Sequence, residues 1–290
     1  MSKKINSSLW IFSALIVTLS FFSLLINHFF FQYPGNNYFP DNTLYIGLTL
    51  LLFYFGASLL FTETNRVKLI AKELLYLYGV MCMLALATNA IQLTPFHPID
   101  AYIIAFEAEW HIHVGDMLTW THQHPSIYNL LGRSYDSLSN QMCIIPLLLI
   151  LSGRFHLLRE YYFLLLFTAL LGFTFYYFFP TTAPASMIQN PLFNEAQLAT
   201  GLKFNQIQAH IQPQTMEGGM IALPSFHTVW ALLCLYLLKE WPIVWFIVLP
   251  INILLIVACV LLGWHYPTDI VAGIVLTLVA YMLLRWCKQT

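Results

Sequence analysis

Eight stretches of the chain consist mainly of apolar residues, and polar or charged segments separate them. Most of these runs approach the ~20 residues that a helix needs to cross a bilayer core. Their approximate positions are 9–31, 43–61, 69–91, 137–151, 160–179, 224–238, 242–262 and 267–285. The run at 137–151 is short, so we expect its helix to begin earlier, near Asn129. This pattern predicts an all-α integral membrane protein with about eight transmembrane helices.

The segment at 96–136 differs from these runs because apolar and acidic side chains are interspersed along it. The apolar residues recur at helical spacing, which predicts an amphipathic helix lying on the membrane surface. Trp110 and Trp120 are suited to anchor such a helix at the interface.

A second long connection, at 181–223, is polar and rich in glutamine. Glu217, Gly218 and Gly219 lie close to its end, directly before residues of chemical interest. Because long loops are often functional, we expect this connection to act as a mobile lid with the two glycines as its hinge.

Composition supports the membrane assignment. Of the 290 residues, 59% are hydrophobic and 9% charged, and the mean hydropathy is +0.70. A soluble domain carries about 25% charged residues. The five cysteines lie in or beside apolar runs without Cys-x-x-Cys spacing, so we expect buried inert thiols rather than disulfides or metal ligands. Nothing in the sequence indicates nucleic-acid binding.

The basic residues are distributed unequally between the two sets of loops that eight helices create. One set, which includes both chain ends, holds ten of the twelve lysines and arginines, and the other holds only Arg133 and Lys203. Loops rich in Lys and Arg lie in the cytoplasm. We therefore expect cytoplasmic termini in a bacterial inner (plasma) membrane, with 96–136 and 181–223 on the extracytoplasmic side.

Two motifs near the C-terminus place histidines on this outer side, at the starts of apolar runs. They are Leu223-Pro224-Ser225-Phe226-His227-Thr228 and His265-Tyr266-Pro267-Thr268-Asp269. His265 and Asp269 are four residues apart and share one helix face, so the carboxylate can hold Nδ1–H and leave Nε2 free to attack phosphorus. With His227 as proton donor, these candidate catalytic residues suffice for phosphoryl transfer through a covalent intermediate.

The same region supplies candidate substrate-binding residues. A helix start at Pro224 and Ser225 would direct first-turn amides and a hydroxyl toward a phosphate. The stretch 179–184 ends the fifth run on the same side and adds two threonine hydroxyls. Interfacial histidines and Pro-Ser helix starts are also common structural features, whereas a carboxylate such as Asp269 near a membrane span is usually functional. The candidates are Pro224, Ser225, Phe226, Tyr266, Thr181 and Thr182.

The histidine-rich part of 96–136 offers an alternative site. Its imidazoles and carboxylates are ligand types that zinc and other divalent metals accept. The residues concerned are Glu107, Glu109, His111, His113, His122 and His124. However, residues two apart on a helix point about 200° away from each other, so one face cannot present both histidines of a His-x-His pair. We favour an interfacial helix and predict no metal and no cofactor.

The order and spacing of the two histidine motifs resemble the type 2 phosphatidic acid phosphatase superfamily, which includes vanadium haloperoxidases. The similarity covers roughly residues 170–275. It implies that His265 is the nucleophile that becomes phosphorylated, that His227 is the general acid and that Asp269 orients the nucleophile. It also implies a histidine phosphatase/phosphotransferase core in the C-terminal half.

The chain departs from the superfamily motifs where cations are usual. The lysine and arginine of the first motif would fall at Gly172 and Phe179, and the usual serine-arginine pair before the nucleophile falls at Cys259 and Val260. Phe226 replaces a usual glycine. With the retained motifs, these features resemble the inositol phosphorylceramide synthase branch. Its members move a phosphorylated head group from a phospholipid to a lipid alcohol and need no metal.

The missing cations favour a substrate with one negative charge. A phosphomonoester such as phosphatidate is close to dianionic near neutral pH, whereas a phosphodiester carries one charge. Each lost charge-assisted hydrogen bond is worth ~1.5–3 kcal/mol, and its loss penalises the dianion more. Arg133 or Lys203 can return a cation by folding back into the site; the alternative is that both are interfacial or solvated.

The sequence therefore predicts a membrane lipid phosphotransferase with phospholipid and lipid-alcohol substrates. One alternative is a lipid phosphatase that hydrolyses phosphatidate or prenyl pyrophosphate by the same chemistry. Another is a non-catalytic lipid-binding relative. We expect N-terminal transmembrane helices at 1–95, the extracytoplasmic amphipathic segment at 96–136, and the catalytic core at 137–290 with its loop at 181–223.

Overall fold

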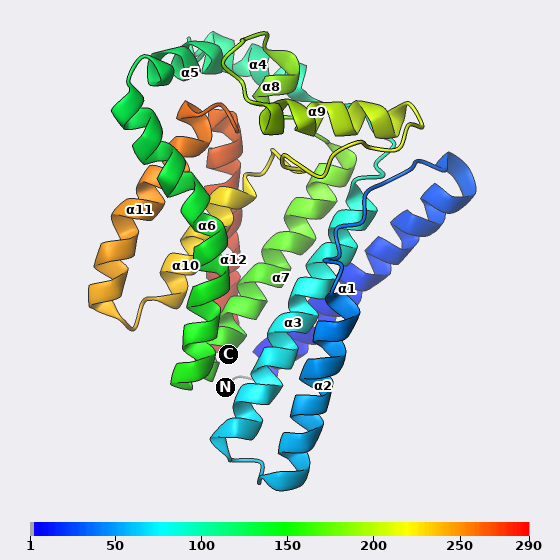
Figure 1. The fold of residues 1–290 in the computed structure, drawn as a ribbon, viewed down its shortest axis with the longest axis vertical. Coiled ribbons are helices and arrows are strands. Elements are labelled where there is room, and N and C mark those ends of the chain that lie inside the picture. The colour runs from blue at the N-terminus through cyan, green and yellow to red at the C-terminus, as the bar shows by residue number, and fades with distance from the viewer. Residues whose placement is uncertain (1–2, 290) are drawn as a thin grey trace.

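The computed structural model describes residues 3–289, which form helices joined by turns and loops (Figure 1). Eight helices coincide with the eight apolar runs and form the bundle. They are α1 (Lys3–Ile26), which continues into the π-helical turn η1 (Asn27–Phe31), α2 (Thr43–Leu60), α3 (Arg66–Ile91), α6 (Pro125–Ser152), α7 (Phe155–Phe178), α10 (Phe226–Leu237), α11 (Pro242–Leu261) and α12 (Pro267–Gln289). Four other helices lie across one end of the bundle and form its cap: α4 (Asp100–Glu109), α5 (Val114–His122), α8 (Pro184–Met187) and α9 (Glu195–Gln208).

Six of the bundle helices are long and apolar enough to cross a membrane, which confirms the all-α membrane class. The exceptions are α10, with 12 residues, and α6, whose first half carries Arg133 and Asp136. The count of eight transmembrane helices stays a prediction. α6 begins at Pro125, four residues before the expected start, because the missing N–H of proline needs no partner in the first helical turn.

Helix α7 occupies the centre of the bundle. It contacts α1, α3, α6, α10 and α12, and 61% of its most apolar window is buried, against 6% for the peripheral α2. Leu157, Tyr161 and Leu165 are among its fully buried side chains. The helices that carry the two histidine motifs, α10 and α12, therefore pack against the most buried of the six candidate membrane spans.

Both termini lie at the end of the bundle opposite the cap (Figure 1). Ion pairs hold this end together. Glu160 pairs with Lys288 and, at 2.7 Å, with Lys239, and Glu73 pairs with Arg159. Several basic residues that the charge pattern assigns to one side thus have acidic partners at that same end.

The segment 96–136 is not the single surface helix that we expected. α4 ends at Glu109, and α5 begins only at Val114, after His111 adopts a left-handed φ of 56° that no α-helix can continue. Trp110 and Trp120 are 68% and 46% exposed, as interfacial anchors require. The acidic face of α4, by contrast, is turned into the protein.

The connection 181–223 contains two helices, α8 and α9. α9 begins with a capping box in which Asn194 and Gln197 bond reciprocally. Its movement as a lid stays a prediction.

All five cysteines are free, and the expectation of buried thiols holds for three of them. Cys234, Cys259 and Cys287 are buried, Cys82 is half-buried, and Cys143 is exposed on the surface of α6. Cys143 is exposed although it lies in an apolar run, because the side of α6 that faces away from the bundle is also apolar.

Candidate active site

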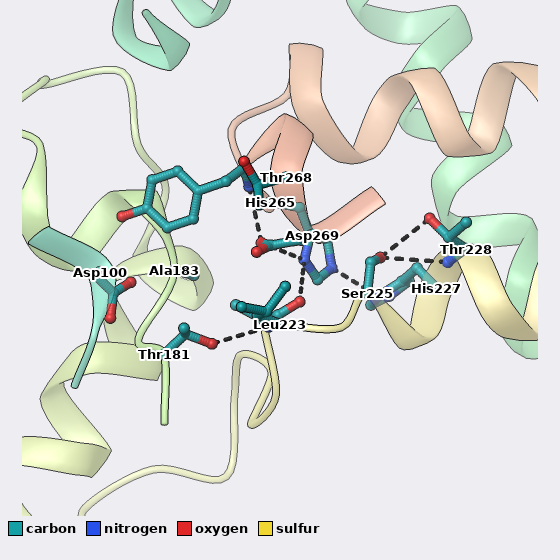
Figure 2. Close-up of polar contacts among 12 residues, drawn as sticks. Asp100, Thr181, Ala183, Leu223, Ser225, His227, Thr228, His265, Thr268 and Asp269 are labelled. Atoms are coloured by element: carbon teal, nitrogen blue, oxygen red, sulfur yellow. Dashed lines mark hydrogen bonds and ion pairs between the residues drawn. The ribbon is translucent and has the colours of Figure 1, made fainter. Parts of the chain in front are cut away.

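The two histidine motifs meet beneath the cap (Figure 2). His227 lies in the first turn of α10, and His265 lies in the turn that precedes α12. His265 Nε2 is 3.3 Å from His227 Nδ1, and His265 Nδ1 is 3.3 Å from Asp269 Oδ2 and 3.1 Å from the carbonyl oxygen of Ala222. The three candidate catalytic residues therefore form one continuous chain.

The partners of His265 determine its tautomer. Asp269 Oδ2, when ionised, and the Ala222 carbonyl can only accept hydrogen bonds, so Nδ1 carries the proton and Nε2 presents a lone pair. His265 is 4% exposed, and its burial lowers its pKa to about 4, although the bond to Ala222 opposes the shift. The imidazole is neutral at pH 7, as a nucleophile requires.

Asp269 also joins the two motifs through the backbone. Its side chain accepts from the Tyr266 N–H (2.9 Å), and its carbonyl accepts from the Ser225 N–H (3.0 Å). One turn later, Gly273 lets α12 approach α10 closely, because a Cβ at this position would lie 2.7 Å from the Ser225 carbonyl oxygen. A larger residue at 273 would separate the histidines.

The hydroxyls predicted to bind phosphate have protein partners. Ser225 Oγ caps α10 by accepting from the Thr228 N–H at 3.3 Å. Thr181 Oγ1 accepts from the Leu223 N–H at 2.9 Å, and Thr182 Oγ1 donates to a carboxylate of the cap. These contacts fix the motifs relative to each other. Direct contact with substrate stays a prediction for all three.

Two carboxylates on α4 hold the stretch 179–184 and the second histidine motif, a role that the sequence analysis gave to neither. Asp100 Oδ2 accepts from Thr182 N (2.8 Å) and Oγ1 (3.2 Å), and Glu107 Oε1 accepts from Thr268 N (2.9 Å) and Oγ1 (2.8 Å). Asp100 and Glu107 are buried, which raises the pKa of both, for Asp100 to about 6. Their spacing of seven residues, which puts them on one helix face, is the sequence signal that could have revealed them.

The histidine pair borders a cavity of only about 30 Å³, close to the volume of one water molecule. Thr200 of α9, Tyr135 of α6 and Trp264 also line it, and the sequence analysis named none of them. Within residues 3–289, no lysine or arginine lines this cavity, and neither do the six predicted substrate-binding residues. The lining must shift before a phosphate can reach the histidines.

The Phe226 ring occupies the space that a side chain at position 172 would need. A Cβ at Gly172 would lie 2.7 Å from Phe226 Cζ, and the Phe226 ring meets Phe173 edge-on at 4.9 Å between centroids. Phe226 therefore faces α7 rather than the histidines. The position where the superfamily lysine would fall is closed by the phenylalanine that replaces the superfamily glycine.

Neither outer cation folds back against the histidines. Lys203 is 2% exposed and donates to the carbonyls of Gly218 (3.3 Å) and Met216 (3.5 Å), and burial lowers its pKa to about 8. It thus holds the end of the 181–223 connection onto α9. Arg133 lies at a separate, polar cavity beside the site.

The alternative metal site is not assembled. Among residues 3–289, no three His, Cys, Asp or Glu side chains are grouped so that they could hold a metal ion. Glu107 binds Thr268 instead, and the Nδ1 atoms of His122 and His124 bond to the carbonyls of Leu118 and Trp120 in the preceding turn.

A family model of the PAP2 superfamily matches residues 101–283. No curated protein and no solved structure matches the chain. The matched region covers well over half of the sequence and runs from α4 into α12. It includes both histidine motifs and Glu107, whereas Asp100 directly precedes it. The superfamily is one of lipid phosphatases and phosphotransferases. The chain therefore belongs to the PAP2 superfamily.

Proposed function

We propose that this protein transfers a phosphorylated head group from a phosphodiester phospholipid to a lipid alcohol, as in the inositol phosphorylceramide synthase branch. The observation that carries the proposal is the chain from Asp269 through His265 to His227, next to a cavity that no described lysine or arginine lines. The hydrogen-bonded chain suits nucleophilic catalysis by imidazole. A cavity lining without described cations suits a phosphate with a single charge.

In the first half-reaction, His265 Nε2 attacks phosphorus. The new P–N bond forms as the P–O bond to diacylglycerol breaks, and His227, which must enter this step as imidazolium, gives one proton to the departing alkoxide and becomes neutral. The phosphorus, still carrying the head group, enters between the two imidazoles and replaces their direct contact of 3.3 Å. Asp269 and the Ala222 carbonyl hold Nδ1–H and stabilise the positive charge that develops on the ring.

In the second half-reaction, the hydroxyl of a lipid alcohol attacks the phosphohistidine. His227 takes the hydroxyl proton, the new P–O bond forms and the P–N bond to His265 breaks. Water in place of the alcohol would make the same site a phosphatase. The pocket lining contains no described lysine or arginine, which supports a diester donor. Neutral donors such as backbone amides and the Thr200 hydroxyl stabilise a phosphate with one negative charge more adequately than one with two.

We also propose that the cap faces the extracytoplasmic side and that the catalytic core comprises 137–290 together with the α4–α5 segment. The unequal distribution of basic residues supports this orientation. The contacts of Asp100 with Thr182 and of Glu107 with Thr268 support including the cap in the core.

The proposal is tested with purified protein in mixed micelles. Phosphatidylinositol labelled in its head group is supplied with and without ceramide or diacylglycerol of a different chain length, and phosphatidate is assayed in parallel for phosphate release. We expect a labelled product lipid that requires the added alcohol and disappears in His265→Ala, while Ser139→Ala, an exposed position on α6, retains it.

Three other outcomes would oppose this proposal. Phosphate release from phosphatidate without any transfer product would make the protein a phosphatase. Equal product formation by the wild type and His265→Ala would remove His265 as the nucleophile. No reaction of any substrate with the folded protein would favour a non-catalytic relative.

A further inference from the structure

A cavity of about 430 Å³ lies in the half of the bundle farthest from the catalytic histidines. It is lined by α1, α3 and α7, which contact one another in pairs. All three helices begin at the end of the bundle that holds the termini (Figure 1). The volume falls within the range of small-ligand sites.

The lining of this cavity changes from polar to apolar with depth in the bundle. Lys72 and Arg159 line its outer end, and Met83 and Leu166 lie further along the same two helices. From Lys72 to Met83, α3 advances about 16 Å, which is roughly half of the ~30 Å thickness of a hydrocarbon core. The cavity therefore has the depth and the polarity of a single leaflet of the bilayer.

Two cations approach the ring of one tyrosine at the outer end. The Arg159 guanidinium lies 4.2 Å from the centre of the Tyr76 ring, and the Lys72 ammonium lies 5.6 Å from it. Both side chains are half-buried. Glu73 pairs with Arg159 and balances only one of the two charges. Because like charges this close repel each other, an anion that enters between them would be stabilised.

The composition of the lining limits the ligand class. One uncompensated positive charge matches the single negative charge of a phosphodiester, and the apolar walls below it match an acyl chain. Among residues 3–289, no aspartate or glutamate lines the cavity, so the ammonium of a zwitterionic head group would find no carboxylate there. Basic pockets between transmembrane helices bind anionic lipid head groups for the same reasons.

Gly79 keeps the cavity open on the α3 side. It lines the cavity between Lys72 and Met83, and a Cβ at this position would meet no atom within 4 Å. Glycine lowers helix stability relative to alanine, so helix formation does not account for it. The open space beside Gly79 can accept an acyl chain that runs along α3.

We infer that this cavity binds one anionic phospholipid, with its phosphate between Lys72 and Arg159 and one acyl chain along α3 past Gly79. The site is separate from the histidines, and the inference does not depend on the transfer reaction. The bound lipid would join α1 and α3, which lie outside the family-matched residues 101–283, to the central helix α7.

The test measures binding to the purified full chain in detergent. Dioleoyl phosphatidylglycerol is the probe, and dioleoyl phosphatidylcholine and inorganic phosphate are the comparison ligands. Native mass spectrometry counts bound lipid, and thermal unfolding measures the stabilisation that binding gives. Lipid held at the histidines is common to the wild type and all variants, so differences between them report on the cavity.

Two variants change the cavity, and each has a matched control. Lys72→Gln removes a charge, and its control is Arg285→Gln, an exposed cation beside a tyrosine ring at the same end that does not line the cavity. Gly79→Phe fills the open space, and its control is Gly56→Phe on α2, where a Cβ also meets no atom within 4 Å.

We expect phosphatidylglycerol to bind and stabilise the protein, phosphatidylcholine to bind at least about tenfold more weakly, and inorganic phosphate to have no effect. Lys72→Gln should weaken binding of phosphatidylglycerol about tenfold, and Gly79→Phe should abolish it, whereas both controls should bind as the wild type does. Equal affinity for the two phospholipids, equal stabilisation by inorganic phosphate, or unchanged binding in either cavity variant would overturn the inference. If Gly79→Phe does not fold, Lys72→Gln against Arg285→Gln decides alone.

Discussion

At the scale of single residues, burial sets the chemistry of His265. Its imidazole has lost most of its contact with water, so the charged form is disfavoured and the ring stays neutral well below the ordinary pKa of 6.5. Neutrality matters because only an unprotonated Nε2 can attack phosphorus.

This shift predicts an unusual pH profile. We expect the acid limb of the kcat/KM profile for a diester donor to lie near pH 4, where His265 becomes protonated, and a separate alkaline limb to follow deprotonation of the general acid His227. The measurement is the initial transfer rate as a function of pH at low substrate concentration. An acid limb with its midpoint near pH 6.5 would contradict the burial of His265 in the working enzyme.

Lys203 is a second residue whose environment determines its behaviour. Its pKa is about 8 in the folded protein and 10.5 in its ordinary state, so between these values the unfolded chain binds more protons. Stability should therefore rise as the pH increases from about 8 to 10.5. We expect thermal unfolding of the wild type to show this rise relative to Lys203→Met. If stability depended on pH in the same way in both proteins, the pKa of Lys203 would not be lowered in the folded state.

At the scale of elements, α4 connects the cap to the stretch 179–184 and to the second histidine motif. In Glu107→Ala, the half-buried N–H and hydroxyl of Thr268 lose their acceptor, which should cost about 1–2 kcal/mol of stability. Because Thr268 directly precedes Asp269, we also expect a lower transfer rate. Unfolding midpoints and rates are compared with those of Glu109→Ala, an exposed carboxylate on the same helix. Equal effects of the two substitutions would rule out the positioning role.

The contact between α7 and α10 predicts a coupled pair. Gly172→Lys alone forces a Cβ to within 2.7 Å of Phe226, an overpacking that typically costs ~1–3 kcal/mol. Phe226→Gly removes a buried ring and should also destabilise the protein. We expect the double variant to lose less stability than the sum of the two losses, and to hydrolyse phosphatidate faster than the wild type because it regains a cation. Additive losses would show that the two side chains do not compete for space.

At the scale of the whole molecule, the termini and the cap lie at opposite ends of the bundle. With the orientation proposed above, alkaline phosphatase fused to the C-terminus should be inactive and green fluorescent protein fused there should be fluorescent. Glu195→Cys, at the exposed start of α9, should react with a membrane-impermeant maleimide in intact cells, to a greater extent than the five native cysteines do. Active alkaline phosphatase at the C-terminus would reverse the orientation.

Features that depend on local pattern could be predicted from the sequence. Apolar runs placed all eight bundle helices, because hydrophobic burial in a bilayer is a property of consecutive residues. His265 and Asp269 could be paired from their spacing alone, because four residues make one helical turn. The unbroken helix expected at 96–136 was wrong, since a single left-handed residue, His111, has no periodic signature.

Features that depend on contacts between distant segments were decided only by the tertiary structure. The Thr181 hydroxyl holds Leu223, and Asp100 holds Thr182 across 82 positions, so groups expected to meet a phosphate instead join parts of the protein. The polar cavity lined by Tyr135 and Trp264 exists because residues of α6, the start of α9 and the end of α11 converge under the cap. Lys203 is buried where the end of the 181–223 connection folds onto α9. Local periodicity determines which face of a helix is apolar, but only packing determines which side chain from elsewhere meets that face.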